Sequence, residues 1–552
     1  MKRDTAKLSE KVYDLLIIGG GIYGAAAAWD AASRGLAVAL IDKADFGSRN
    51  SSNSQKTIHG GLRYMQHFDL RRIRESAYER KIMMRIAPHL VHPMPCLIPT
   101  YGRLMRSIMP LVLRIYDLVS LDRSRLKDPQ KHIPKAKVIS KEECQRLIPG
   151  IQEKGLTGGV IWHDCQVYNT ERLVLSFVKS ANNAGADAAN YVEAVGFLED
   201  GNIVKGVKAK DRLNDTEFKI QAKIVLNASG PWVGNVMGML KTPHNRKISL
   251  SKMLVLVVNQ PLTQNYAYGI PSWKKFKDDD AVVSKGYRLL FISPWRNCSL
   301  IGTAQTVYEG DPEDFKITEA DIQNFIEEVN EAYPRSVLAR KDVSFFYGGL
   351  LPIDGVNQNG DVNLIKRYEI FDHEDEGIEG LISIMSVKYT EGRYVAQKAI
   401  DLVIKKLGIK SHECITMETP VQGGFIESFN DLLANAIESR PHGLSDEIIR
   451  HLVYNYGSEY TEIIKYIDEN HYLGEKVSSR SNVIEAEILY GIREEMAQKL
   501  ADVILRRTEL GTAENPGEDA LKTCAGIMAE EMGWDESRIQ KELNDVKEIY
   551  TL

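Results

Sequence analysis

The order of apolar and polar residues at the start of the chain predicts a strand, a helix and a second strand. Tyr13 to Ile18 is a short apolar run that ends in a glycine-rich turn, Gly19 to Gly24. An alanine-rich helical stretch follows as far as Gly35. A second apolar run, Ala37 to Ile41, then stops at Asp42. This order predicts a βαβ unit of the expected size.

Further along, the pattern predicts a loop, two helices and a second sheet. Asp45 to Gly61 is polar and glycine-rich, as expected of a loop, whereas Leu70 to Ala87 is charged and helical. Strand-like apolar runs among turn residues indicate a mixed sheet beside the first one. They fall at Gly155 to Trp162, Asp187 to Leu226 and Met253 to Val258.

After about residue 418 the sequence becomes helix-forming and charged. Glu485 to Thr508 and Ser537 to Tyr550 are predicted helices, the second with apolar residues on one face at Ile539, Leu543, Val546 and Ile549. The predicted fold class is α/β. A Rossmann-like domain is interleaved with a mixed-sheet substrate domain in residues 1–417, and an α-helical C-terminal domain occupies residues 418–552. A chain of 552 residues exceeds the size of a single hydrophobic core, which agrees with several domains.

The composition narrows the class of protein. Hydrophobic residues make up 43% and charged residues 26%, which is ordinary for a soluble globular chain. A net charge of -5 gives no reason to expect a nucleic-acid partner, because phosphate binding needs concentrated positive charge. The six cysteines have no metal-ligand spacing and predict reduced thiols in a cytoplasmic protein. We expect neither a signal peptide nor a transmembrane helix, because no stretch reaches roughly 18 apolar residues.

The glycine-rich turn carries the first candidate chemistry. In Gly19-x-Gly21-x-x-Gly24 the first glycine makes the turn, the second lets backbone approach a pyrophosphate, and the third allows close helix packing. Asp42 ends the second strand, where it can accept hydrogen bonds from ribose hydroxyls. A glycine-rich turn without a ligand would show the same three glycines, but the strand, the helix and the acid together favour a dinucleotide. The motif does not separate FAD from NAD.

A longer segment resembles a known family. Ser51 to Tyr64, SSNSQKTIHGGLRY, is similar to the flavin-contacting segment of FAD-dependent glycerol-3-phosphate dehydrogenases, members of the D-amino-acid-oxidase-like superfamily. Further blocks keep the family's order along nearly the whole chain: Ala87 to Leu90, Asp164 to Val167, Asn227 to Val233, Pro294 and Trp295, Ile301 to Thr303, Lys388 to Thr390 with Arg393, and Leu505 to Gly511.

The resemblance implies both a fold and an activity. The fold would be a Rossmann-like FAD-binding domain, a substrate-binding sheet domain and a helical cap. The activity would be oxidation of a secondary alcohol of a small polyol phosphate, glycerol 3-phosphate to dihydroxyacetone phosphate, with FAD as cofactor. Electrons would pass to another acceptor, commonly a membrane quinone.

The resemblance and the chemistry of the side chains together give candidate site residues. Arg63 is the first choice for an anionic substrate because a guanidinium offers bidentate hydrogen bonds, and Lys388 would stabilise a reduced, anionic flavin. A salt-bridge arginine and a solvated lysine are the structural alternatives. The candidate catalytic residues are His59, Arg63, Tyr64, Arg367 and Lys388. The candidate cofactor-binding residues are Gly19, Gly21, Gly24, Asp42, Ser51, Ser52, Lys56, Gly60, Gly61, Gly230, Gly349, Lys388 and Thr390; we expect no metal site.

Two departures from the family put the substrate in question. Leu351 stands where the family has an arginine that grips the substrate anion, and Lys252 to Val258 lacks the family's histidine. The general base is then His59 or Lys388. Losing one charged ligand removes roughly 1.5 to 3 kcal/mol, or one to two decades in affinity. A 2-hydroxy acid or amino acid oxidoreductase, and a catalytically silent flavoprotein subunit, therefore remain alternatives.

A basic amphipathic segment lies between residues 103 and 127. Ten apolar residues are surrounded by six basic residues against two acidic ones, Asp117 and Asp122; the basic residues are Arg103, Arg106, Arg114, Arg123, Arg125 and Lys127. We expect a helix broken near Pro110 that either lies in the bilayer interface or packs on the protein core. Candidate partners are thus a small anionic hydroxylated substrate, quinone, the cytoplasmic face of a membrane and, as a homo-oligomer, a second copy of the chain.

Overall fold

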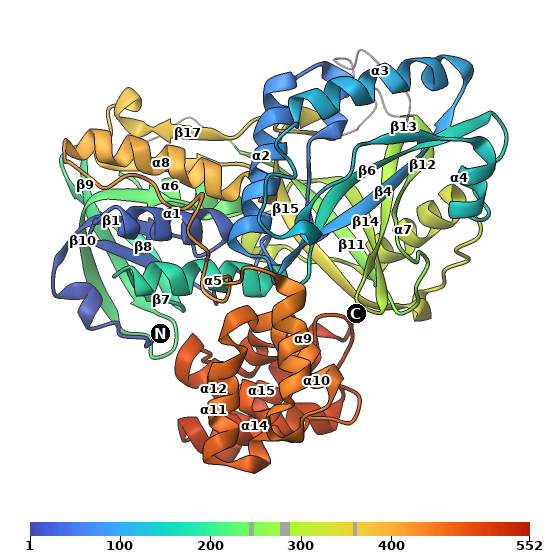
Figure 1. Ribbon diagram of the computed structural model, residues 1–552. Helices are drawn as coiled ribbons and strands as arrows, with labels where there is room; N and C mark the ends of the chain where they lie inside the picture. Colours follow the sequence, from blue (N-terminus) through green and yellow to red (C-terminus); the bar gives the residue numbers. More distant parts are fainter. Residues whose placement is uncertain (242–247, 276–286, 357–361) are drawn as a thin grey trace.

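The computed structural model describes residues 1–241, 248–275, 287–356 and 362–552. Two sheets lie side by side, and a bundle of helices sits beneath them (Figure 1). The predicted α/β class is confirmed. Within the described ranges, no helix is long and apolar enough to cross a membrane.

The first sheet has eight strands, and its centre is parallel. The order β17-β18-β10-β1-β2-β7 places β1 between β2 and β10, parallel to both, and the antiparallel pair β8 and β9 extends from β10. Its strands are β1 (Val12–Ile18), β2 (Val38–Ile41), β7 (Asp187–Ala189), β8 (Val192–Asp200), β9 (Ile203–Asp211), β10 (Glu217–Asn227), β17 (Glu369–Asp372) and β18 (Leu381–Met385).

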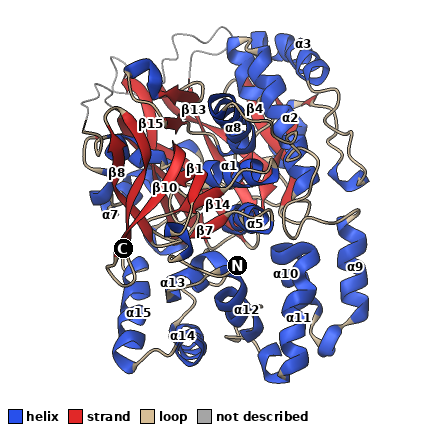
Figure 2. Cartoon of the chain, turned by 90° about the vertical axis from the view of Figure 1, so that its left-hand side faces the viewer, coloured by secondary structure: helices blue, strands red, loops and turns tan. Residues whose placement is uncertain are grey.

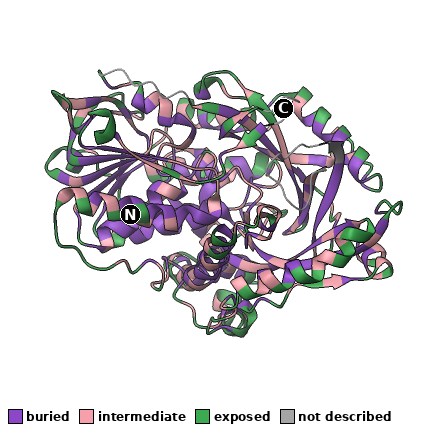
Figure 3. Cartoon of the chain, turned by 90° about the horizontal axis from the view of Figure 1, so that it is seen from above, coloured by how far each residue is buried: buried purple, intermediate pink, exposed green. Residues whose placement is uncertain are grey.

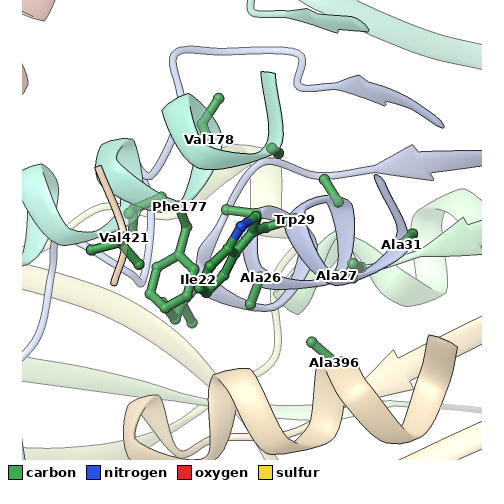
Figure 4. Close-up of a cluster of buried hydrophobic side chains, with 14 of the residues drawn as sticks. Ile22, Ala26, Ala27, Trp29, Ala31, Phe177, Val178, Ala396 and Val421 are labelled. Carbon is green, nitrogen blue, oxygen red and sulfur yellow. The ribbon is translucent and has the colours of Figure 1, made fainter. Parts of the chain in front are cut away.

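Helix α1 (Ile22–Ser33) packs on this sheet between two other helices. Its four consecutive alanines, from Ala25 to Ala28, are all buried, and their small side chains allow α5 (Thr170–Asn183) and α8 (Gly392–Leu407) to approach closely. Trp29 fills the space beside Phe177 of α5, with ring centroids 5.5 Å apart (Figure 4). The predicted N-terminal βαβ unit is therefore confirmed as the centre of the first hydrophobic core.

One predicted sheet assignment is wrong. The strands within Asp187 to Leu226 join the first sheet rather than a sheet beside it, because β10 bonds in parallel to β1 through pairs such as Leu15 with Ile224. Parallel pairing is set by contacts far apart in sequence, which local periodicity does not reveal.

The second sheet has ten strands in the order β16-β15-β11-β14-β13-β12-β4-β6-β3, with β5 paired to β6. Its strands are β3 (Thr57–Ile58), β4 (Val91–Tyr101), β5 (Lys137–Ile139), β6 (Leu156–Val167), β11 (Ser249–Val258), β12 (Ala267–Lys275), β13 (Tyr287–Trp295), β14 (Cys298–Tyr308), β15 (Val343–Val356) and β16 (Val362–Leu364). Most strands of both sheets are buried (Figure 3). The helices around the two sheets include α2 (Leu70–Ile86), α3 (Arg103–Val119), α4 (Lys141–Leu147), α6 (Val233–Met237) and α7 (Glu319–Ala332).

Helix α3 runs through Pro110 without a break, contrary to the sequence-based expectation. A proline inside a helix removes one backbone hydrogen bond and leaves a carbonyl unpaired. Pro110 is exposed, so water can satisfy that carbonyl and the helix continues.

The C-terminal part of the chain is helical, as predicted (Figure 2). This part has two small hydrophobic cores, one containing Leu452 and the other Val503. Both are separate from the hydrophobic cores that contain the strands of the two sheets. The elements are α9 (Phe429–Ser439), α10 (Asp446–Tyr456), α11 (Tyr460–Glu469), α12 (Glu485–Glu495), α13 (Leu500–Asp502), the π-helical turn η12 (Val503–Arg507), α14 (Glu518–Met532) and α15 (Glu536–Ile549).

Candidate active site

The turn between β1 and α1 has no room for a side chain at Gly19, Gly20 or Gly24. Gly19 has φ +104°, and a Cβ there would lie 2.6 Å from the carbonyl oxygen of Ala228. A Cβ on Gly24 would lie 1.8 Å from the carbonyl oxygen of Gly19, so helix and strand could not pack as they do. Gly21 is the N-cap of α1 and brings no capping side chain, which leaves the positive end of the helix open to an anion.

Asp42 and Ser51 lie beside this turn. We call the turn from Gly19 to Gly24, together with Asp42 and Ser51, the dinucleotide corner. The half-buried carboxylate of Asp42 accepts the N–H groups of Gly20 at 2.7 Å and Ala44 at 2.8 Å. Burial raises the pKa of Asp42 to about 6, even though these two hydrogen bonds favour the charged form. Ser51 Oγ accepts the N–H of Ile22 at 2.9 Å, so the Ser51 segment lies against the first turn of α1. These residues fit a dinucleotide, with a helix N-terminus for the phosphates and an acid for the ribose.

Other residues of the predicted cofactor set surround the same corner. Gly230, with φ +60°, begins the turn after β10, two residues from the Ala228 carbonyl that lies against Gly19. A Cβ on Gly349 of β15 would lie 2.8 Å from Oδ1 of Asn50, and Asn50 also bonds to the backbone of Leu350. Asn50 therefore joins the loop of the first sheet to the second sheet.

Ser52 and Lys56 lie deeper than the glycines. Ser52 is buried and bonds to the carbonyl of Gly47. The Lys56 side chain is fully buried, and its Nζ donates to Glu171 Oε1 at 2.8 Å and to Thr170 Oγ1 at 2.9 Å. Burial lowers the pKa of Lys56, although the negative charge of Glu171 acts to raise it. The Lys56 ammonium is thus engaged inside the protein, and its backbone is bonded as well, since its carbonyl accepts the N–H of Val167 at 2.8 Å and its N–H donates to Ser54 Oγ at 3.2 Å.

His59 is oriented by a buried carboxylate. Because Ile58 of β3 pairs with Cys165 of β6, the next residue, His59, lies opposite Asp164. His59 Nδ1 lies 3.0 Å from Asp164 Oδ2, and the His59 side chain is 56% exposed. The other oxygen of Asp164 accepts the N–H of Gly60 at 2.7 Å.

Asp164 is ionised in this setting. Burial opposes the charge, but the hydrogen bond from His59 and the positive charge of Arg80 outweigh burial and lower the pKa of Asp164. An ionised Asp164 can accept a hydrogen bond from Nδ1–H of His59, and in that tautomer Nε2 carries the free lone pair of the ring. Thr390 is brought to the same point, since its Oγ1 accepts the His59 backbone N–H at 3.0 Å.

Lys388 lies next to Tyr64. Its Nζ is 4.5 Å from the centroid of the Tyr64 ring and donates to Glu391 Oε1 at 2.9 Å, with 18% of the side chain exposed. The hydroxyl of Tyr23, from helix α1, donates to the Lys388 carbonyl at 2.5 Å. The strand end that carries Lys388 is thereby tied to the helix of the dinucleotide corner.

The two candidate arginines lie at the surface of the site. Arg63 is exposed on the short helix after Gly61. The side chain of Arg367 is 66% exposed and lies 3.4 Å from Asp69, the N-cap of α2. The structure brings His59, Tyr64, Lys388 and Thr390 together. Arg63 and Arg367 are exposed on segments that meet at Asp69, and we call these two arginines the cationic rim.

The two departures from the family lie in adjacent strands. Met253 of β11 pairs with Gly349 of β15, two residues from Leu351. Both Met253 and Leu351 belong to one apolar cluster with Val255 and Tyr347. The two positions therefore lie in an apolar cluster, where the resemblance implied a histidine and an arginine.

Asp164 and Glu391 were not among the predicted site residues. Asp164 falls in the block Asp164 to Val167 that resembles the family, and Glu391 directly follows the block Lys388 to Thr390. Their contacts with His59 and Lys388 depend on strand pairing and turn geometry. Within the described residues, no group of three or more His, Cys, Asp or Glu side chains is placed to hold a metal ion.

The fold and this corner define a dinucleotide-dependent oxidoreductase, and comparison with known proteins specifies it. Residues 14–376 match the family described as FAD dependent oxidoreductase, and residues 414–539 match the C-terminal domain of alpha-glycerophosphate oxidase. The chain belongs to the FAD dependent oxidoreductase family, and its cofactor is FAD, as the sequence predicted.

Its relatives narrow the class. The glycerol-3-phosphate dehydrogenase of Synechocystis sp. is 32% identical over 560 residues, covering 99% of this chain and 98% of the relative. The aerobic glycerol-3-phosphate dehydrogenase of Staphylococcus aureus is 31% identical over 529 residues, covering 92% and 89%. The crystal structure of the glycerol-3-phosphate dehydrogenase from Bacillus halodurans complexed with FAD matches with a TM-score of 0.77 at 27% identity, covering 99% of this chain and 95% of that chain. The resemblance to this family is confirmed.

Proposed function

We propose that the protein oxidises the secondary alcohol of a small polyol phosphate, with glycerol 3-phosphate as the first candidate, and passes the electrons to quinone or another acceptor. The observation that carries the proposal is the pair of His59 and Asp164 beside Lys388 and Thr390. This pair supplies a base next to a cation at the end of the FAD-binding loop. The similarity to glycerol-3-phosphate dehydrogenases supports the same substrate class.

The chain's own residues account for the proton. The Nδ1–H of His59 donates to Asp164, which leaves Nε2 to accept the proton of the substrate hydroxyl. As the proton arrives, the ionised Asp164 stabilises the imidazolium. When bound, FAD supplies the acceptor for the hydride that leaves the carbinol carbon. Lys388 places a positive charge where negative charge develops in the site.

The two arginines of the cationic rim would bind the phosphate of the substrate. Arg63 and Arg367 are both exposed, and a guanidinium offers two parallel hydrogen bonds to a phosphate. Because Leu351 adds no charge, we expect glycerol 3-phosphate to be oxidised with a high KM.

Kinetics of one rim variant test this assignment. Arg63→Ala should raise the KM for an anionic substrate by roughly one to two decades, because a charge-assisted hydrogen bond is lost, while FAD content stays equal. Arg335→Ala, at another exposed arginine, is the matched control and should leave the KM unchanged. Equal kinetics in all three proteins would place the anion elsewhere.

A second candidate substrate follows from the apolar cluster. Met253 and Leu351 would suit the apolar side chain of a 2-hydroxy acid or an amino acid better than a phosphate. Turnover of such an acid with a kcat/KM above that of glycerol 3-phosphate would favour this alternative. A flavoprotein that no candidate reduces, but that dithionite does, would be a catalytically silent subunit.

The finer assignment of location rests on α3. Leu104, Leu111 and Leu118 recur every seven residues on α3 and are 72%, 59% and 65% exposed. Exposed arginines flank this leucine stripe, namely Arg103, Arg106 and Arg114. Arg123 is instead buried and paired with Asp117, and Asp122 is paired with Arg74 and Lys81, so these residues add little surface charge. We propose that α3 lies on the anionic, cytoplasmic face of a membrane, close to quinone.

Vesicle flotation tests the membrane contact. The protein should float with vesicles that contain anionic lipid, and replacing the three leucines of the stripe by asparagine should abolish flotation. Flotation of the triple variant equal to wild type would contradict the proposal. A homo-oligomer could cover the same leucines, and a molar mass in solution that falls to that of one chain in the triple variant would identify this occupant instead.

A further inference from the structure

The loop that carries Asp42 is held from its other side by the C-terminal helical domain. Three residues beyond Asp42, the carboxylate of Asp45 is fully buried. Arg506 Nε donates to Asp45 Oδ2 at 2.5 Å. Arg507 donates through Nη1 to Oδ2 at 2.6 Å and through Nη2 to Oδ1 at 2.8 Å. Asn190 adds a fourth hydrogen bond, at 2.8 Å to Oδ1.

These bonds keep the carboxyl group of Asp45 ionised. Burial opposes ionisation, but the two guanidinium groups outweigh burial and hold the pKa of Asp45 well below its usual range. An Arg–carboxylate pair with two parallel bonds fixes orientation as well as distance. The position of Asp45 is thus set by residues more than 460 positions away in the sequence.

The local shape of the helical domain allows both arginines to face one carboxylate. Neighbouring residues of an α-helix point in different directions, but Val503–Arg507 is a π-helical turn, in which the N–H of Thr508 bonds to the carbonyl of Val503. Such widened turns are uncommon and occur often at functional sites. Arg506 is held in turn by Asp502 at 2.6 Å, which also accepts the hydroxyl of Tyr191 at 2.6 Å.

The backbone of the loop is fixed to the same segment. The N–H of Tyr191 donates to the carbonyl of Ala44 at 3.0 Å, and the N–H of Val192 donates to the carbonyl of Asp42 at 2.7 Å. Ala44 in turn donates its N–H to the side chain of Asp42. A displacement of Asp45 would therefore move Ala44 and, with it, the carboxylate of Asp42.

The ion pairs made by helix α5 join the helical domain to the first sheet away from this loop. Arg172 and Lys179, both on α5, bond to Glu495 and Glu459. These pairs hold the helical domain against the first sheet, whereas Arg506 and Arg507 contact the Asp42 loop directly. Arg172 also donates to the carbonyl of Arg507, and Arg507 Nε donates to the carbonyl of Glu495. Lys179 bonds to neither Arg506 nor Arg507, so it is the residue at which docking of the domains can be tested separately.

We propose that the helical domain maintains FAD affinity, with Asp45, Arg506 and Arg507 as positioning residues that hold Asp42 in the shape that binds the ribose. The proposal rests on the FAD corner at Gly19 to Asp42. None of the three residues needs to touch the cofactor. Their contribution is to prevent the loop from relaxing when FAD is absent, so that binding does not have to reorder it.

FAD titration of the apoprotein tests the proposal. Asp45→Asn and Arg507→Met should each weaken FAD binding by roughly one to two decades, since a charge-assisted interaction is lost and a buried charge is left without its partner. Arg507→Lys keeps the charge and should restore part of the affinity. Lys179→Met removes an ion pair between the same two domains and should lower the unfolding midpoint of the apoprotein without the loss in FAD affinity.

The outcomes separate the possible failures. Wild-type FAD affinity in folded Asp45→Asn, or a loss in Lys179→Met as large as in Arg507→Met, would overturn the proposal. If Arg507→Met does not fold, Arg507→Lys and Asp45→Asn still decide it, with circular dichroism reporting the helix content. Gly21→Val should lose FAD in any case, because a side chain would occupy the phosphate space; normal FAD in that variant would mean that the FAD corner itself is misassigned.

Discussion

Asp164 holds His59 through Nδ1 at 3.0 Å and holds the adjacent Gly60 through its backbone N–H at 2.7 Å. One buried carboxylate therefore fixes both the ring of the candidate base and the backbone of the segment that resembles the family's flavin-contacting segment. The arrangement explains how a base is available although β11 lacks the family's histidine. In the mechanism that we propose, His59 transfers the proton and Asp164 orients the His59 ring.

Asp164→Asn should lower kcat by roughly two decades, because the amide can hold His59 in the wrong tautomer and cannot stabilise the imidazolium. The amide keeps the size of the side chain, so FAD content should remain equal. Steady-state kinetics with flavin absorbance in the same samples measure both. A kcat within twofold of wild type would show that another group accepts the proton.

Gly24→Ala should abolish FAD retention, because the added Cβ would lie 1.8 Å from the carbonyl of Gly19 and would push α1 away from β1. Gly526→Ala is the matched control. Gly526 is in helix α14, a Cβ there meets no atom within 4 Å, and alanine should raise stability by up to about 1 kcal/mol. The ratio of flavin to protein absorbance after purification measures the first effect, and FAD retained by Gly24→Ala would refute the packing argument.

Leu351→Arg should increase turnover of glycerol 3-phosphate if the pocket accepts a phosphate, because the variant restores the family's missing anion ligand. If the native substrate is less charged, the new guanidinium would be desolvated without a partner, at a cost of several kcal/mol, and activity on that substrate would fall. We expect weak wild-type activity and a gain in the variant at equal FAD content. A variant with no gain would count against a phosphate pocket.

The pH dependence of stability should carry the signature of His451. Burial opposes its charge, but the carboxylates of Glu487 and Glu509 raise the pKa of His451 to about 10. A raised histidine pKa stabilises the folded state fully below the unfolded value near 6.5, and this stabilisation is lost as pH rises to about 10.

The comparison of wild type with His451→Gln isolates this effect. The difference in unfolding free energy should be on the order of a few kcal/mol at pH 6 and should shrink steadily towards pH 10. Denaturant unfolding of both proteins from pH 6 to pH 10 measures it. A difference independent of pH would mean that His451 is neutral throughout.

Local spacing was sufficient to predict the strand, the glycine turn and the helix at the start of the chain. Gly19, Gly21 and Gly24 act within one turn, and Asp42 lies at the end of the next strand, so the order of elements defines their geometry. In the C-terminal domain, the periodicity of Ser537 to Tyr550 predicted α15, because this helix buries one face. The predicted helical stretch Glu485 to Thr508 is instead divided into α12, α13 and a π-helical turn.

Contacts between distant segments were not visible in the sequence. Three such contacts are the pairing of β10 with β1, the hydrogen bond of His59 with Asp164 and the ion pair of Arg507 with Asp45. Each joins segments far apart in the sequence, so no local pattern predicts it. The same reason explains Lys56, whose neighbour Glu171 lies on α5. Only the fold shows that its charge is already paired.

Anaerobic mixing with glycerol 3-phosphate tests the central proposal most directly. The account predicts that the absorbance band of oxidised FAD is bleached by glycerol 3-phosphate in the wild type, and at least tenfold more slowly in His59→Asn, since the base is removed. Glycerol, which lacks the anion, should bleach the band far more slowly. An unchanged flavin spectrum with glycerol 3-phosphate, in protein that dithionite fully reduces, would contradict the proposed function.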